Sequence, residues 1–355
     1  MHLWVRAECR ETERRVALLP EQAARLVAKG VNVTLERSDV RIIPIEGYEA
    51  AGCTIASAGG WENAPEDAFV LGLKELPDDG SPLRHKHIMF GHAFKHQPAG
   101  KNLLKRFAVG GGELLDLEYL VDEAGKRVAA FGYWAGFAGA AVSIMGWLRQ
   151  KELIGDTHLS AFPHSMEMIE PLRTAIMSMK RQRPSVLIIG ALGRVGTGAR
   201  EACEALGLQV TLWDQEETAQ GGPFHEIFEH DILLNCILAR PGCPVFVPED
   251  AKAMPRSLSM IGDIACDPES DFSPIKVYNR VTTWDDPYFR ASEDPVLEVM
   301  AVDNLPSLLP LESSEDFSEQ LFPFLLGLFG LGAQEDATVW ERARQTFALH
   351  VPRIQ

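Results

Sequence analysis

Positive charge is scarce in this chain, because 34 Lys and Arg residues face 50 Asp and Glu residues and leave a formal net charge of −16. Such an acidic protein repels nucleic-acid phosphates and anionic lipids, so the composition argues against nucleic-acid and membrane-surface partners. The sequence also has no P-loop, no basic patch and no Ser-His-Asp pattern. Any pocket for an acidic substrate must therefore gather Arg and Lys locally, against the field of the whole protein.

Cysteine is sparse as well, and the six residues form no C-x-x-C pair. Scattered cysteines of this kind are typical of free thiols in a reducing compartment rather than of a disulfide framework. The segment 1–11 carries charges where a secretory signal peptide would need an apolar core. We therefore expect a cytoplasmic protein without a signal peptide. No internal repeat or low-complexity segment is present.

The chain has one long run without charge, residues 128–148, which is long enough to span a bilayer. Several glycines interrupt this run, its first residues, 128–132, have the composition of a β-strand, and the rest of the chain is polar. A strand end followed by a fully buried helix of small residues explains these features better than a membrane helix. We expect no membrane partner.

The N-terminal third alternates between strand and helix patterns. A strand at 3–6, a helix at 20–30 with Pro at its start and Gly at its end, and a strand at 31–36 form a βαβ unit. Because the alternation continues, we expect a mostly parallel sheet covered by helices. The further elements expected are strands at 68–74, 87–92 and 114–118, a helix at 102–109, and a turn at 122–126 that leads to a last strand at 128–132.

A second α/β unit begins at the apolar helix near Tyr133. Its expected strands are buried and apolar, as in a doubly wound nucleotide-binding domain. After Pro310 we expect two amphipathic helices, and since chain ends often lie close together, this tail should return to the first domain. The strands are expected at 186–190, 209–214, 231–237 and 259–263, and the helices at about 314–328 and 339–350.

The most informative motif is a glycine-rich turn after an apolar strand. Gly190, Gly193 and Gly196 precede an expected helix, and the next strand ends at Asp214, 18 residues after Gly196. In dinucleotide-binding units the glycines let the backbone approach the pyrophosphate at the helix N-terminus, and the acid bonds the ribose hydroxyls. Since Ala191 replaces the first glycine of G-x-G-x-x-G, a glycine turn without a ligand is the alternative. The combination of a strand, a glycine turn, a helix and a following acid favours an NAD-binding site. The charge of Asp214 disfavours NADP, because it repels the extra phosphate on the ribose.

Charged side chains recur where strands of the first domain end, and parallel sheets bind ligands at the carboxyl ends of their strands. Lys74 stands out because desolvation beside an apolar strand would lower its pKa and suit it to proton transfer. The alternatives are a lysine that has reached solvent and, for His92, a structural histidine with satisfied hydrogen bonds. The candidates are Arg10 and Arg15 after the first strand, Lys74 and Glu75 after the fourth, and His92 and Lys95 after the fifth.

Histidines are dense between positions 85 and 96, which raises the question of a metal site. No cysteine or paired carboxylate accompanies them, and a zinc site needs three or four convergent ligands. We expect no metal and interpret the cluster as a chance grouping. Its members are His85, His87, His92 and His96.

A series of short motifs runs in order along nearly the whole chain. They are RAE at 6–8, RVALLP at 15–20, GLKE at 72–75, FGHAFK at 90–95, LDLE at 115–118, RVAAFG at 127–132, AGFAG at 135–139, GALGR at 190–194, GGPFHEI at 221–227 and DNLPSLLP at 303–310. In this combination the chain resembles the lysine-forming, NAD-dependent saccharopine dehydrogenases, which are relatives of alanine dehydrogenase and transhydrogenase.

The resemblance implies two Rossmann-like, doubly wound α/β domains with the active site in the cleft between them. Residues 1–131 and 311–355 would form a discontinuous substrate or catalytic domain, and residues 132–310 an NAD-binding domain. Lys74 and His92 would be the acid–base pair. The residues implied to bind substrate are Arg10, Arg15, Lys95, Glu118 and Arg127, with Glu118 holding or tuning Lys74, and those implied to bind NAD are Gly190, Gly193, Arg194, Val195, Gly196, Asp214 and Asp303.

The implied reaction is the reversible oxidative deamination of saccharopine to L-lysine and 2-oxoglutarate. NAD takes a hydride from the carbon bonded to the secondary amine, water adds to the resulting imine, and the carbinolamine collapses. Two titratable groups suit the loss of the amine proton and the activation of water, and the resemblance assigns these steps to Lys74 and His92 respectively. Guanidinium groups are well shaped to bind the substrate carboxylates.

Two features depart from the family pattern. Arg10 stands where lysine is usual, and the segment between Leu148 and Pro184 differs from that of the fungal enzymes. An opine-type or alanine-type dehydrogenase with another amine and 2-oxo acid is therefore an alternative. A non-catalytic NAD-binding sensor is a second alternative, against which Lys74 and His92 argue, because binding alone requires neither.

Overall fold

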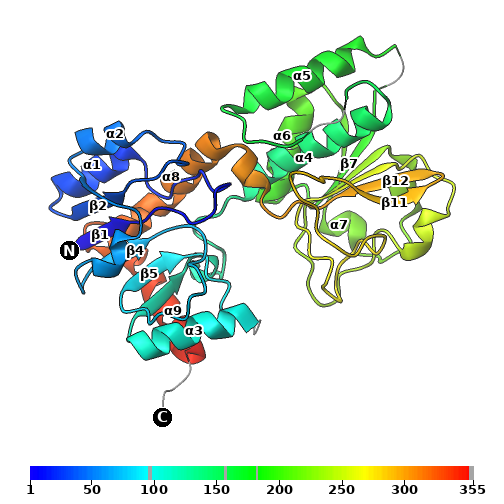
Figure 1. The fold of residues 1–355 in the computed structure, drawn as a ribbon. Helices are drawn as coiled ribbons and strands as arrows, with labels where there is room; N and C mark the ends of the chain where they lie inside the picture. The colour runs from blue at the N-terminus through cyan, green and yellow to red at the C-terminus, as the bar shows by residue number, and fades with distance from the viewer. Residues whose placement is uncertain (95–97, 156–157, 181–182, 352–355) are drawn as a thin grey trace. The chain divides into compact units, whose positions relative to one another are not determined.

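The chain forms two compact α/β units in a computed structural model that describes residues 1–94, 98–155, 158–180 and 183–351 (Figure 1). Unit 1 comprises residues 1–130 and 310–355, and unit 2 comprises residues 131–309. The chain thus leaves unit 1 once and returns to it with its last two helices. Within the described ranges, no helix is long and apolar enough to cross a membrane.

Unit 1 is built on a parallel sheet in the order β3-β2-β1-β4-β5-β6. From β1 the sheet is extended by β2 and β3 on one side and by β4, β5 and β6 on the other. The order in which strands are added therefore reverses between β1 and β4. Open parallel sheets bind ligands beyond the carboxyl ends of their strands at such a reversal. The strands are β1 (His2–Val5), β2 (Asn32–Glu36), β3 (Thr54–Ala56), β4 (Phe69–Leu71), β5 (Lys86–Met89) and β6 (Glu113–Asp116).

The C-terminal helices pack onto the N-terminal elements of unit 1 (Figure 1). Ser314 and Ser318 of α8 accept the backbone N–H groups of Val16 and Leu19 at 2.9 and 3.2 Å. On α9, Phe347 packs edge to face on Phe107 of α3, with 5.7 Å between ring centroids. The helices of unit 1 are α1 (Pro20–Ala28), α2 (Ile45–Ala50), η1 (Gly60–Asn63), α3 (Pro98–Gly110), η2 (Leu117–Tyr119), α8 (Pro310–Leu328) and α9 (Gln334–His350).

Unit 2 contains a second sheet, in the order β11-β12-β10-β9-β7-β8, in which only β11 is antiparallel to its neighbour. Its strand order reverses between β7 and β9. The expectation that its strands are all buried is wrong for β8, which lies at the edge of the sheet beside β7 and leaves Leu212 39% exposed. The strands are β7 (Val186–Ile189), β8 (Val210–Trp213), β9 (Ile232–Asn235), β10 (Met260–Asp263), β11 (Phe289–Glu293) and β12 (Val296–Met300).

The central strands β7 and β9 of this sheet are covered by apolar side chains on both faces. On one face Ile188 and Leu234 pack against α4, α5 and α6, while on the other Leu187 and Leu233 pack against loop residues such as Phe246. Adjacent strand residues point to opposite faces, which explains why β7 and β9 are runs of apolar residues. The helices are α4 (Gly132–Gln150), α5 (Ser165–Ser178), α6 (Arg194–Ala205), α7 (Gln215–Thr218), η3 (His225–Glu229), η4 (Glu249–Lys252) and η5 (Leu305–Leu308).

The uncharged run separates into a loop and a helix. The strand expected at its start is not formed, because the N–H of Val128 donates to Leu120 O at 3.0 Å and that of Ala130 to Gln320 Oε1 of α8 at 3.2 Å. These partners replace a neighbouring strand. The turn at 122–126 and the buried helix are confirmed, since α4 begins at Gly132 and is fully buried from Gly136 to Leu148.

Two glycines allow α4 and α6 to approach each other at the backbone. A Cβ atom at Gly136 would overlap with the carbonyl oxygen of Val195, and one at Gly198 would overlap with the carbonyl oxygen of Tyr133. Neither backbone can move aside without disturbing the helix to which it belongs. The position of the N-terminal turn of α6 therefore depends on small residues in a helix that is distant in sequence.

We expect Gly136→Ala to destabilise unit 2 by at least about 1–3 kcal/mol, the usual cost of overpacking, because the clash is with backbone. The matched control is Gly132→Ala in the same helix, where the nearest atom to a new Cβ, Val195 Cγ2, is at an ordinary 3.4 Å. Thermal unfolding of both variants measures the difference. Equal melting temperatures for the two variants would contradict the packing argument.

Candidate active site

Lys74 and His92 follow neighbouring strands of unit 1, β4 and β5. The N–H of Phe90 donates to Leu73 O at 3.0 Å, which joins the two segments at the backbone just before these residues. Burial lowers the pKa of Lys74 and the adjacent Arg15 lowers it further, whereas Glu13 opposes the shift. Lys74 therefore gives up its proton more readily than an ordinary lysine.

His92 is held by a carboxylate. Its Nδ1 lies 2.6 Å from Glu118 Oε2, and its ring stacks on Phe90 with 6.4 Å between centroids. The backbone at His92 is left-handed, with φ 47°, and its side chain is 50% exposed. A carboxylate at Nδ1 favours the tautomer whose Nε2 carries the free lone pair. The atom of His92 that can accept a proton from a ligand is therefore Nε2.

The structure shows a partner of Glu118 that the sequence analysis did not expect. Glu118 lies in η2 after β6 and contacts His92, because β6 neighbours β5, which leads to His92. Its expected role in holding or tuning Lys74 stays a prediction, and the carboxylates that raise the pKa of Lys74 are Glu13 and Glu75. The strand order thus gives each proton-transfer candidate its own acidic neighbours.

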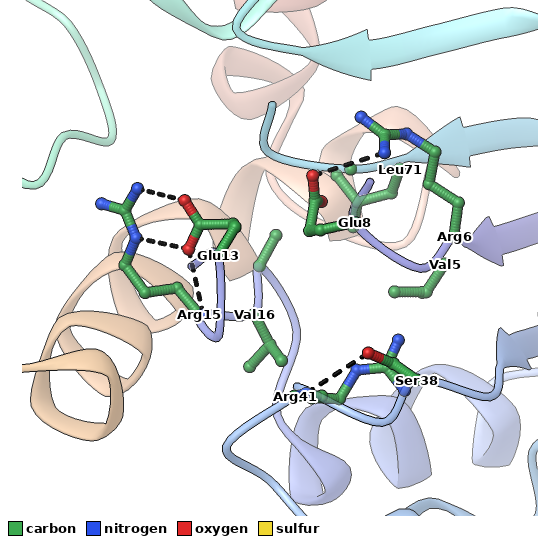
Figure 2. A pocket seen from close by; sticks show the side chains of 11 residues that line it. Val5, Arg6, Glu8, Glu13, Arg15, Val16, Ser38, Arg41 and Leu71 are labelled. Carbon is green, nitrogen blue, oxygen red and sulfur yellow. Dashed lines mark hydrogen bonds and ion pairs between the residues drawn. The ribbon is translucent and has the colours of Figure 1, made fainter. Parts of the chain in front are cut away.

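The predicted substrate-binding residues differ in their surroundings. Arg15 is buried and forms a two-point contact with Glu13, at 2.8 Å from Nε and 2.6 Å from Nη2 (Figure 2). Burial alone would raise the pKa of Glu13, but the paired Arg15 outweighs the effect of burial and lowers this pKa.

Two other predicted substrate-binding residues lie at the surface. Arg10 pairs with Glu75, and Arg127 is exposed beside the 122–126 turn. The prediction for Lys95 falls outside the described residues.

The histidine cluster contains structural side chains. His85 Nε2 lies 2.9 Å from Ala64 O, and His87 is fully buried between the rings of Trp61 and Phe107. Burial lowers the pKa of His87 to about 3. In the described ranges, which exclude His96, no three His, Cys, Asp or Glu side chains are placed to hold a metal ion.

His87 gives unit 1 a defined pH dependence. The unfolded side chain takes up a proton below its ordinary pKa of 6.5 and the folded one only near 3, so stability is lost as the pH falls between these values. We expect the wild type to lose up to about 1.4 kcal/mol per pH unit more than His87→Leu in this window. Urea unfolding at several pH values measures the difference. Parallel curves for the two proteins would contradict a buried neutral His87.

The glycine turn lies at the N-terminus of α6 in unit 2. Gly190 has a φ of 84°, and a Cβ at Gly196 would overlap with Gly190 O, so both positions require glycine. Gly193 caps the helix, and Arg194 and Val195 are its first residues. Backbone N–H groups in the first turn of a helix have no intrahelical acceptor and form a site for an anion.

A pocket of about 640 Å³ opens at this turn, where the order of the second sheet reverses. Asp214 accepts the N–H of Leu192 at 3.0 Å through Oδ2 and that of Gln215 at 2.9 Å through Oδ1, which ties the acid to the turn. Leu192 and Leu238 are 81% and 63% exposed. The lining residues are Ile189, Gly190, Leu192, Gly193, Asp214, Gln215, Thr218, Cys236, Ile237, Leu238 and Arg240.

The sequence prediction missed the loop 236–240 that lines this pocket. The position of this loop could have indicated its role, because it follows a predicted strand, β9. That strand pairs with β7 and therefore ends beside the glycine turn. The predicted residues Gly190, Gly193 and Asp214 line the pocket, and Arg194, Val195 and Gly196 follow directly in α6. Asp303 is not among the residues that line this pocket; it lies on an exposed turn after β12 near Cys266.

Comparison with known proteins relates the chain first to alanine dehydrogenase and transhydrogenase by a profile and by its fold, and then to one family by its sequence. The family profile described as "Alanine dehydrogenase/PNT, N-terminal domain" matches residues 4–138. A solved L-alanine dehydrogenase shares the fold, with a TM-score of 0.65 at 17% identity over 98% of this chain and 94% of that chain.

Two yeasts provide relatives named "Saccharopine dehydrogenase [NAD(+), L-lysine-forming]". The Schizosaccharomyces pombe protein is 41% identical over 99% of both chains, and the Yarrowia lipolytica protein is 41% identical over 99% of this chain and 98% of its own. The chain belongs to the family of lysine-forming saccharopine dehydrogenases.

Proposed function

We propose that this protein is an NAD-dependent oxidoreductase that converts saccharopine to L-lysine and 2-oxoglutarate, reversibly. The observation that carries this proposal is the full-length likeness to enzymes named for that reaction. Two proton-transfer candidates on adjacent strand ends agree with it, because the reaction needs both amine deprotonation and water activation.

NAD fits unit 2, and residues 132–310 are the proposed NAD-binding domain. The N-terminus of α6 would hold the pyrophosphate, and the absence of room for a Cβ at Gly196 beside Gly190 O matches the glycine that packs the helix closely against the strand in such turns. Asp214 would bond the adenosine ribose, and the exposed Leu192 and Leu238 offer apolar contacts for adenine. Bound NAD would supply the acceptor for the hydride of the substrate. Asp303 is proposed as a further NAD-binding residue.

In unit 1 the acidic residue at the end of the second strand, Glu36, has a different role from that of Asp214 in unit 2. Glu36 ends β2, as Asp214 follows β8, but its buried carboxylate already accepts four N–H donors and has no capacity left for a ribose. The donors are Trp4 Nε1 at 2.9 Å, Ala7 N at 2.8 Å, Gly59 N at 3.1 Å and Trp61 N at 2.7 Å. This supports residues 1–131 and 311–355 as the substrate domain.

Within that domain Lys74 would take the proton of the substrate amine, since burial and Arg15 already favour its neutral form. His92 would take a proton from water through Nε2 while Glu118 stabilises the charged ring. Arg127, which is exposed, would bind a carboxylate directly, and Arg15 would do so as part of its pair with Glu13. Arg10, Lys95 and Glu118 complete the proposed substrate set.

The composition also bears on where the protein acts and on its partners. We propose a cytoplasmic location, because all six cysteines are free. We also propose that it has no nucleic-acid partner, because the net charge is −16.

The direct test is the appearance of NADH with saccharopine and NAD, beside a panel of opines and simple amino acids. We expect saccharopine to be the preferred substrate. We expect Lys74→Met and His92→Gln each to lower turnover by about 10²–10⁴-fold, the usual contribution of a general acid or base, with little change in NAD affinity.

A suitable control is Lys105→Met, which removes an exposed lysine of α3 that the proposal does not use. Preference for alanine or another opine would overturn the substrate assignment. Near-normal turnover of both site variants with saccharopine would overturn the roles of Lys74 and His92.

Cofactor choice gives a separate prediction. NAD should be used more efficiently than NADP, and Asp214→Asn should narrow the ratio, because it removes the charge that repels a ribose phosphate while keeping one side-chain oxygen as an acceptor for Leu192 N–H. Values of kcat/KM with both cofactors measure the ratio. Equal efficiency of the wild type with NAD and NADP would contradict the role of Asp214.

A further inference from the structure

The segment that carries Lys74 is held by two side chains from the loop after β1. Glu8 Oε1 accepts the N–H of Leu73 at 2.6 Å, and Glu8 Oε2 accepts the N–H of Lys74 at 3.0 Å. Arg6 Nη2 donates to the carbonyl oxygen of Lys74. One carboxylate and one guanidinium thus bind the backbone of Lys74 on both sides of its Cα atom.

Arg6 and Glu8 also bind each other in a buried position. Arg6 Nη1 lies 3.3 Å from Glu8 Oε2, and the two side chains are only 1% and 8% exposed (Figure 2). Removing both charges from water is costly, and such pairs often add little net stability compared with apolar residues. What this pair does supply is a set of directed hydrogen bonds to one short segment.

Gly72 shows how closely the guanidinium is fitted to this segment. A Cβ at Gly72 would overlap with the guanidinium of Arg6, so the arginine lies directly against the glycine backbone. The remaining groups of the segment are also bonded, since Gly72 N–H donates to Ile88 O and Leu73 O accepts from Phe90 N–H, both at 3.0 Å. Every backbone N–H and carbonyl of Leu73 and Lys74 therefore has a defined partner.

We propose that Arg6 and Glu8 are positioning residues that fix the backbone of Leu73 and Lys74 and thereby place the Lys74 amine for proton transfer. The proposal rests on the proposed function, because it assumes that Lys74 exchanges a proton with substrate. A displacement of about 1 Å at a reacting group costs up to about 100-fold in rate. The clamp made by Arg6 and Glu8 limits such displacement at the backbone, whereas the neighbours that set the charge of Lys74 are Arg15, Glu13, Arg10 and Glu75.

The decisive variant is Glu8→Gln. It keeps one carbonyl acceptor but turns an amide donor toward a second N–H and removes the charge opposite Arg6. We expect kcat with saccharopine to fall about 10- to 100-fold. The KM for NAD should stay within about twofold, because the proposed cofactor pocket belongs to unit 2. Amide hydrogen exchange of the peptide that contains Leu73 and Lys74 should become faster.

The matched control is Glu113→Gln, which breaks another carboxylate–arginine contact of unit 1, with Arg344 at 3.5 Å, at the start of β6. It should leave both the exchange at residues 73–74 and kcat unchanged. If Glu8→Gln fails to fold, Glu8→Asp retains the charge with a shorter reach, and we expect it to show the same changes to a smaller degree.

Faster exchange at residues 73–74 with unchanged kcat would show a purely structural role and overturn the proposal. Unchanged exchange in Glu8→Gln would overturn it as well. A wild-type protein without saccharopine activity would refute the proposed function, and the catalytic role of the clamp with it. A wild type that is active and a Glu8→Gln variant with full turnover would refute the clamp alone.

Discussion

The arrangement of the candidate site in unit 1 depends on the buried carboxylate of Glu36 at the end of β2. Its four N–H donors come from β1, from the loop after β1 and from the segment after β3, so a single side chain joins three parts of the chain. Hydrogen bonds to a charged group contribute about 1.5–3 kcal/mol each, and loss of the acceptor would leave several donors without partners. One donor, Ala7, lies between Arg6 and Glu8. The carboxylate that fixes Ala7 therefore also fixes the two residues that bind the backbone of Lys74.

The same sheet topology serves two purposes in the two units. Both sheets have a point at which the strand order reverses, and in both an acidic residue stands at the end of the second strand. In unit 2 the turn after β7 is rich in glycine, Asp214 accepts backbone N–H groups of the same region and caps α7, and a large pocket remains. In unit 1 the turn after β1 carries charged side chains, and Glu36 is fully bonded. The difference between a nucleotide site and a proton-transfer site thus lies in the loops, not in the fold.

The fold was predictable from the sequence where apolar runs and turn residues agree. The strands before Lys74, His92 and Gly190 and the buried helix α4 follow from such runs, because each buries a continuous set of apolar side chains. The strand expected at 128–132 fails because a side chain of α8, Gln320, satisfies the backbone of Ala130, and that contact joins residues 190 positions apart. Likewise, the exposure of β8 follows from its place at the edge of the sheet, which its composition does not encode.

The sequence by itself determined the chemistry that is present: a lysine and a histidine at strand ends, a glycine turn with an acid after the next strand, and an acidic surface. It did so because these features are local, each set by residue type and short spacing. The tertiary structure alone decided the partners. Glu118 binds His92 because β6 neighbours β5, Glu13 neutralises Arg15 beside Lys74, and Glu8 holds the backbone after β4. Such pairings depend on strand order and on contacts between distant segments, for which a single sequence carries no periodic or compositional signal.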